Sequence, residues 1–176
     1  FWDTPVPKLE ISSVPTLVGT VESHHGDPSG FACVLDYGRA YETGSTTPEE
    51  VAQRALAAIT ASETAPFPLR MFIACQEDAV MAQAQASAQR WQAGNPLGPF
   101  DGVPVAIKDE FDLLPYGSTL GSSFLGRNPP HEEATVVTKL REGGALLLGK
   151  TNMHELGIGV TGLNPHYGAV RNPYRS

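Results

Sequence analysis

Three stretches of the chain space their apolar residues as an amphipathic helix does. The first begins at Thr47, which is followed by Pro48 and Glu50, the residue types that cap and open a helix. Its apolar face is formed by Val51, Ala52, Ala55, Leu56 and Ile59. A second helix is predicted over residues 78–92 and a third over residues 133–142, each followed closely by glycine.

Two short apolar runs have the composition of buried strands. Residues 103–107 follow an Asp-Gly turn, and Pro104 places this run at the start of a strand or at a sheet edge. Residues 145–148 form the second run, directly after the glycines that end the third helix. Strand, helix and strand in this order indicate an α/β fold with parallel neighbours. We therefore predict a mixed, largely parallel sheet with helices on both faces.

The segment before the first helix has a different composition. Residues 1–44 are rich in Pro, Ser, Gly and His, which predicts a loop-rich arm around the outside of a larger body, with the compact part over residues 45–176. No apolar run approaches the ~20 residues of a membrane span, so no transmembrane segment is expected. Because the chain starts at Phe1 rather than Met, removal of a targeting segment stays open, and a cytoplasmic location is favoured.

The charge and the cysteine and histidine content exclude several classes of partner and of site. The net charge is −7 and the pI is about 5.1, which argues against nucleic acid and anionic membrane surfaces. Two cysteines, Cys33 and Cys75, make no disulfide framework and are expected to be free thiols. The histidines lack the spacing of zinc ligands, so no zinc site is expected.

Two phosphate-binding patterns occur in the sequence, and both stand in the wrong context. Residues 144–151 match G-x-x-x-x-G-K-T, but the middle letters are Ala-Leu-Leu-Leu, which favour a buried strand over a phosphate loop, and a helix precedes them. Residues 157–162 match G-x-G-x-x-G, but a polar stretch separates them from the preceding strand and Pro165 follows. We reject both as nucleotide sites.

Lys108 is the most informative single residue. It follows the strand predicted over residues 103–107, and functional groups of open α/β sheets gather at the carboxyl ends of strands. Taken alone, a surface lysine beside Asp109 and Glu110 is the simpler interpretation. The segments around Lys108 change that judgement.

Three blocks of sequence resemble the amidase signature family in content, order and spacing. Residues 98–109 are similar to the lysine motif of that family, and residues 143–155 are similar to its second-strand segment. Residues 164–173 resemble the lead-in to its serine-rich loop. Details at residues 41–48 and 157–159 place the likeness nearest to the fatty acid amide hydrolase branch.

The resemblance implies a catalytic set of a lysine, a serine in a cis peptide and a second serine. Lys108 takes the place of the base, while both serines are expected beyond Ser176. Ser122 and Ser123 lack the flanking residues of the family serines and are expected to be loop serines. A lysine can accept a proton only when it is neutral, and burial favours the neutral form. We therefore expect a buried Lys108, with Asp109 and Glu110 pointing away or paired elsewhere.

The same resemblance places residues 156–159 beside the acyl pocket. Gly157, Ile158 and Gly159 are its candidate substrate-binding residues, since glycine permits close approach of the backbone to a ligand. A turn that needs a positive φ is the alternative explanation for the glycines. Ile158 is either a pocket wall or a core residue, and Met153 is expected in the core.

The implied activity is hydrolysis of a carboxylic amide to acid and amine through an acyl-enzyme, without a metal or cofactor. The substrate class stays open between fatty acid amides, small amides and the glutamine of an amidotransferase. The expected partners are this small amide and the C-terminal remainder of the amidase domain, and homo-oligomerisation stays open. Residues 1–176 alone are expected to be inactive. A non-catalytic binding or assembly module on the same scaffold is the alternative.

Overall fold

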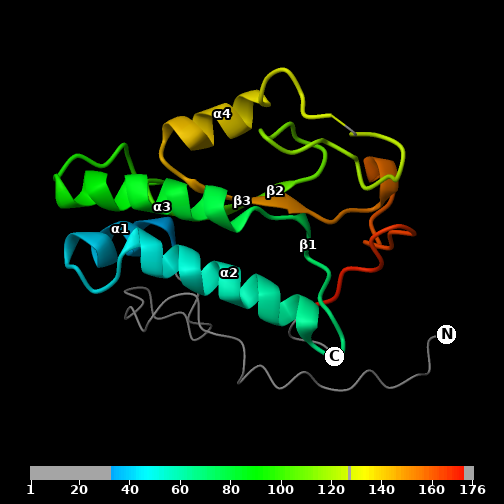
Figure 1. The fold of residues 1–176 in the computed structure, drawn as a ribbon, viewed down its shortest axis with the longest axis horizontal. Helices are drawn as coiled ribbons and strands as arrows, with labels where there is room; N and C mark the ends of the chain where they lie inside the picture. The colour runs from blue at the N-terminus through cyan, green and yellow to red at the C-terminus, as the bar shows by residue number, and fades with distance from the viewer. Residues whose placement is uncertain (1–32, 127, 173–176) are drawn as a thin grey trace.

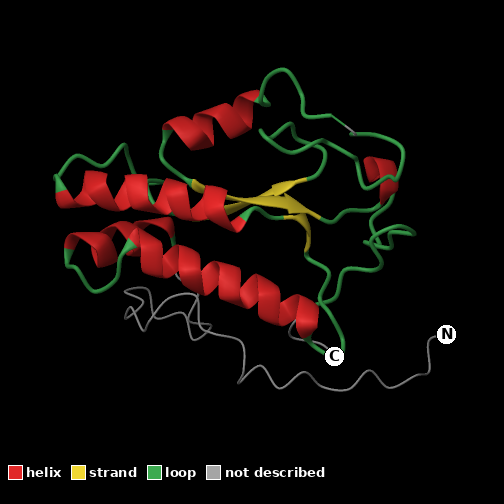
Figure 2. Cartoon of the chain, viewed as in Figure 1, coloured by secondary structure: helices red, strands yellow, loops and turns green. Residues whose placement is uncertain are grey.

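The computed structural model describes residues 33–126 and 128–172 and shows a three-stranded sheet between helices (Figure 2). The strands β1 (Phe72–Ala74), β2 (Pro104–Lys108) and β3 (Leu146–Thr151) lie in the order β1-β3-β2. β2 runs parallel to β3, and β1 runs antiparallel to it. The predicted mixed sheet is confirmed, and Pro104 begins β2 at an edge of the described sheet, as its residue type predicts.

Helices cover both faces of this sheet. The described α-helices are α1 (Val34–Glu42), α2 (Pro48–Thr64), α3 (Glu77–Gln92) and α4 (Thr135–Glu142). Figure 1 shows α2 and α3 on one side of the sheet and α4 on the other. The start of α2 is the predicted one, because the Thr47 hydroxyl accepts a hydrogen bond from the Glu50 N–H at 3.2 Å and the Glu50 carboxylate accepts one from the Thr47 N–H at 3.3 Å.

Alternate residues of β3 enter two hydrophobic cores. Leu146 and Leu148 pack with Ala and Leu side chains of α2 and with Val80 and Ala84 of α3. Ala145, just before β3, and Leu147 face the opposite side, where they pack with buried residues that include Val137 of α4. This alternation is the period of two that a strand covered on both faces requires.

The hydrophobic pattern predicts neither α1 nor β1. The region expected to be a loop-rich arm contains the helix Val34–Glu42, which is a correction, while residues 1–32 of that arm lie outside the described part of the chain. β1 spans three residues, too few for an alternating pattern to register. The division of the chain at residue 44 stays a prediction.

A buried carboxylate fixes the turn before β2. Asp101 is fully buried and accepts hydrogen bonds from the Ser87 hydroxyl at 2.6 Å and from the Arg90 guanidinium at 2.7 and 2.8 Å. The Leu97 N–H donates to the same carboxylate at 2.8 Å. Burial acts to raise the pKa of Asp101, but the donors from Arg90, Ser87 and Leu97 outweigh it and hold that pKa below its ordinary value. α3 thereby holds the start of β2.

Within residues 33–126 and 128–172, none of the helices has the length and apolar character needed to cross a membrane.

Candidate active site

Lys108 is the last residue of β2 and lies opposite Thr151 of β3, as the strand pattern predicts. Its side chain is 47% exposed, and its Nζ lies 3.0 Å from Oε1 of Glu110. The expectation of a buried Lys108 without a carboxylate partner is therefore wrong for this chain. The physical reason is that β2 lies at an edge of the described sheet, so the ammonium meets water and the nearest acid.

Asp109, the next residue, behaves in the opposite way. It is fully buried and accepts hydrogen bonds from the hydroxyl of Thr119 and from the N–H of Gly121, the latter at 2.9 Å. Its Oδ1 lies 3.1 Å from Nζ of Lys150. Both Asp109 and Glu110 were expected to point away from Lys108 or to be paired elsewhere. This expectation is confirmed for Asp109 and wrong for Glu110.

Lys150 is a charged residue of this region whose role the sequence motifs do not reveal. It lies within β3, in the segment that matches a phosphate-loop pattern, and the predicted strand is confirmed and extends as far as Thr151. Its side chain is fully buried, and its Nζ donates to the carbonyl of Phe111 and the hydroxyl of Ser118, each at 2.9 Å. A lysine continuing a run of buried apolar strand residues is the signal that points to an internal ion pair.

Two asparagines join the loops around the strand ends. The Asn164 amide donates to the carbonyls of Gly121 and Met153, both at 2.8 Å, and its oxygen accepts the N–H of His166 at 2.8 Å. The Asn152 amide donates to carbonyl oxygens of two further loops at 3.0 and 3.1 Å. Both residues are buried, and no spacing rule in the sequence identifies them.

The segment proposed for the acyl pocket lies in a short 3-10 turn, Glu155–Gly157, and the residues after it. Gly157 has φ 68°, which favours glycine, and a Cβ at Gly159 would overlap the ring of His154. Turn geometry and packing thus account for both glycines. Ile158 is 81% exposed, so it is not a core residue of the described chain, whereas Met153 is buried as expected. The binding role of residues 157–159 stays a prediction.

The serine and histidine side chains of this region that could take part in chemistry make structural contacts instead. Ser122 is buried, donates to the Thr119 carbonyl at 2.8 Å and receives the Leu125 N–H, as a loop serine does. His166 pairs with Glu155 at 2.9 Å on a partly exposed surface. No group of three or more potential metal ligands occurs among residues 33–126 and 128–172. Cys33 and Cys75 are free thiols, as expected.

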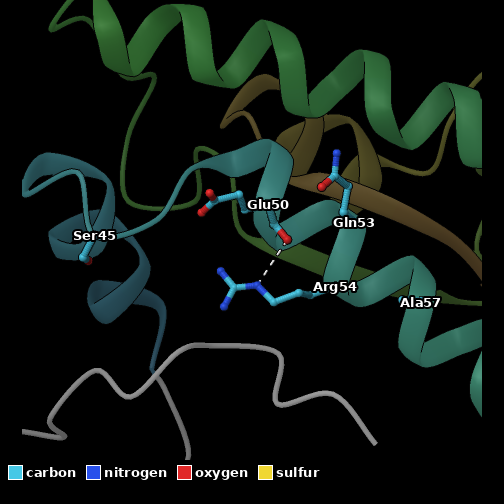
Figure 3. Close-up of a pocket in the computed structure, with 5 residues that line it drawn as sticks. All are labelled: Ser45, Glu50, Gln53, Arg54 and Ala57. Carbon is cyan, nitrogen blue, oxygen red and sulfur yellow. Dashed lines mark hydrogen bonds between the residues drawn. The ribbon is translucent and has the colours of Figure 1, made fainter.

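A pocket of about 510 Å³ lies away from these residues, along α2 (Figure 3). It is lined by Ser45, Glu50, Gln53, Arg54 and Ala57. Arg54 is held by its own helix, because its Nε donates to the Glu50 carbonyl at 3.2 Å. None of the lining residues comes from the ends of β2 or β3, so this pocket does not belong to the predicted site.

Comparison with known proteins gives one consistent result. A profile of the family described as Amidase matches residues 55–176. The chain is 41% identical over 142 residues to a fatty acid amide hydrolase of Oryza sativa subsp. indica, covering 80% of this chain and 23% of that protein. It is 41% identical over 108 residues to one subunit of the mitochondrial glutamyl-tRNA(Gln) amidotransferase of Ixodes scapularis, covering 61% of this chain and 21% of that protein. The chain spans about a quarter of the length of these curated relatives.

A solved structure extends the likeness to three dimensions. The native peptide amidase from Stenotrophomonas maltophilia superposes with a TM-score of 0.75 at 29% identity. The match covers 84% of this chain and 31% of that chain. The α/β fold with helices on both faces of a mixed sheet is thus common to both.

Proposed function

The chain belongs to the amidase signature family, and on that premise we propose that it carries the base of an enzyme that hydrolyses carboxylic amides. The observation that carries this proposal is the position of Lys108. It ends a parallel strand, its side chain reaches the surface, and the adjacent Asp109 is bound to another lysine. A group at this end of a sheet can meet a substrate and a nucleophile supplied by neighbouring chain.

In the proposed mechanism, neutral Lys108 removes a proton from the serine of the cis peptide, which in turn takes the proton of the nucleophilic serine. The nucleophilic oxygen attacks the amide carbon, the C–N bond breaks and the amine leaves with the proton. Water then hydrolyses the acyl-serine to the acid. We place both serines in sequence that follows Ser176, so residues 1–176 alone form no acyl-enzyme.

Glu110 bears on this mechanism because it is the ion-pair partner of Lys108, with Nζ and Oε1 3.0 Å apart. Both side chains of the pair are partly exposed, 47% for Lys108 and 34% for Glu110. A solvated pair of this kind contributes about 0–1 kcal/mol. Lys108 can therefore exchange Glu110 for a serine hydroxyl at small cost when the site is assembled.

For the substrate we propose a fatty acid amide, with Gly157, Ile158 and Gly159 beside its acyl chain. The exposed apolar side chain of Ile158 and the curated likeness to fatty acid amide hydrolases support this class. Glutamine is the second candidate, because the chain is equally similar in identity to the amidotransferase relative, over a shorter stretch.

The proposal is tested with the full-length protein that contains this chain. We expect acid release to be fastest from a long-chain fatty acid amide, slower from a short amide and slowest from glutamine. Added hydroxylamine should divert the acyl group to a hydroxamate, which shows the acyl-enzyme, and the Lys108→Ala variant serves as the blank. Preference for glutamine would support the second candidate. Absence of acid release from every amide would contradict the enzyme and favour a binding module.

A further inference from the structure

One arginine has a buried nitrogen without a hydrogen-bond partner. Nη1 of Arg171 is shielded from water, yet it finds no acceptor among residues 33–126 and 128–172. Within that part of the chain it is the one buried side-chain nitrogen or oxygen in this condition. Buried polar atoms are almost always hydrogen-bonded, so an orphaned guanidinium nitrogen indicates a partner that the described residues do not supply.

The chain around Arg171 fixes its position. Its N–H donates to the Leu69 carbonyl at 3.0 Å, which joins this last described segment to the loop between α2 and β1 (Figure 1). The guanidinium carbon lies over the ring of Phe67, 5.5 Å from the ring centre. An aromatic face attracts the positive charge but offers no oxygen to Nη1. The contact with Phe67 therefore orients the side chain without satisfying it.

The charge of Arg171 is also unbalanced. Five ion pairs occur in the described part of the chain, and none of them includes Arg171 or Arg70, whose guanidinium lies against Gly168 of the same segment. Arg90 and Arg141, in contrast, each donate from two nitrogens to both oxygens of one carboxylate. The anchored arginines of this chain thus show the partner that Arg171 lacks.

We propose that Arg171 is a binding site for a carboxylate group beside Phe67. The planar fork of a guanidinium matches the two oxygens of a carboxylate, and such a partner satisfies both the orphaned Nη1 and the charge. A carbonyl oxygen or a water molecule satisfies Nη1 but leaves the charge unbalanced. The inference goes beyond the proposed amide hydrolysis and does not depend on Lys108.

Two sources of a carboxylate fit this site. The chain has 19 Asp and Glu residues against 12 Lys and Arg, so an acidic side chain from outside the described residues is one source. A free carboxylate ion is the other source, since Arg171 as a whole is only partly buried in the described chain. The two sources give different responses to an added carboxylate.

The first measurement compares the thermal unfolding midpoint of the full-length protein in sodium acetate and in sodium chloride of equal ionic strength at pH 7. If a free carboxylate binds, acetate raises the midpoint of the wild type by about 1–3 °C. Arg171→Gln should show no difference between the two salts. Arg39→Gln, which removes an exposed arginine of α1, is the matched control and should respond as the wild type does.

The second measurement detects an acidic side chain that already occupies the site. Acetate then has no effect, and Arg171→Gln lowers the midpoint by about 2–5 °C at pH 7. A carboxylate paired with an arginine has a lowered pKa, so its contribution is complete above the ordinary value of about 4 and is lost as the pH falls through the lowered value. The difference between wild type and Arg171→Gln should therefore shrink between pH 7 and pH 3, whereas a lost contact with Phe67 alone leaves it constant.

Arg171→Lys keeps the positive charge without the planar fork, and it replaces Arg171→Gln if that variant does not fold. It should show the same patterns at smaller size. A wild type that does not respond to acetate, together with a pH-independent effect of Arg171→Gln or none, would overturn the inference, because Arg171 then acts only by packing. A midpoint that rises in sodium phosphate and not in acetate would overturn the carboxylate. None of these measurements uses turnover, so the assignment of Lys108 is tested separately.

Discussion

Lys108 and Lys150 lie on neighbouring parallel strands and differ in almost every physical respect. Lys108 is 47% exposed and has one carboxylate partner that is itself partly solvated. Lys150 is 0% exposed and contacts a buried carboxylate, two carbonyls and a hydroxyl. The proposed base, Lys108, is thus the lysine with fewer and more solvated partners, because a base must be able to leave its ion-pair partner. Lys150, whose partners are all hydrogen-bonded to it in the interior, stabilises the surrounding loops.

The largest expected effect on folding comes from breaking the buried pair. Lys150→Met leaves Asp109 as an unpaired buried charge, which costs about 3–5 kcal/mol of the free energy of unfolding. Urea denaturation of the full-length protein, followed by circular dichroism, measures this. The exposed Lys139→Met is the control and should change the unfolding free energy by no more than about 0.5 kcal/mol. Equal stability of the two variants would remove the contrast between buried and exposed lysines.

A second buried carboxylate, Asp101, extends the comparison of buried and exposed charges to the pH dependence of stability. Asp101→Asn should cost about 2 kcal/mol, because Arg90 and Ser87 lose a charged acceptor. The pKa of Asp101 is lowered in the fold, so its contribution is complete above the ordinary value of about 3.9 and is lost as the pH falls through the lower folded value. Acid denaturation should therefore weaken the wild type more than the variant. A variant with an unchanged acid transition would contradict this.

Glu110→Gln tests the exposed ion pair of Lys108 and should have a small effect on both stability and turnover. The solvated pair contributes about 0–1 kcal/mol, so unfolding should hardly change. In the variant, Lys108 no longer has to leave a carboxylate partner to reach the serine hydroxyl, so kcat/KM at pH 7 should rise by a factor of about two to three. Glu142→Gln at the exposed end of α4 is the matched control. A fall in kcat/KM for Glu110→Gln alone would assign Glu110 a positive role in the reaction.

No effect at all is expected from nucleotides. Residues 144–151 include the central strand β3, and Lys150 has no free donor, so calorimetry with ATP and magnesium should show no binding. Micromolar binding that disappears in Lys150→Met would contradict the strand interpretation.

Local signals predicted the frame of the fold well. The Thr47 cap, the glycines after the helices and the proline that opens β2 are chemical requirements written in a few adjacent residues. The environment of a side chain is not local in this sense. The partners of Lys150 lie more than 30 positions earlier in the sequence, and Asn164 reaches Gly121 across a separation of 43 residues. Lys108 lies at its strand end as predicted, but its exposure depends on what covers that end, which no pattern around residue 108 specifies.

The measurement that tests the central claim most directly compares turnover and stability in one variant. For Lys108→Ala in the full-length protein we expect turnover of a fatty acid amide to fall by about 10²–10⁴-fold, the usual contribution of a proton-transfer group. The free energy of unfolding should change by no more than about 0.5 kcal/mol, because an exposed side chain with a solvated partner is removed. Lys139→Ala should leave both quantities unchanged. Near-normal turnover in a folded Lys108→Ala protein would contradict the assignment of Lys108 as the base.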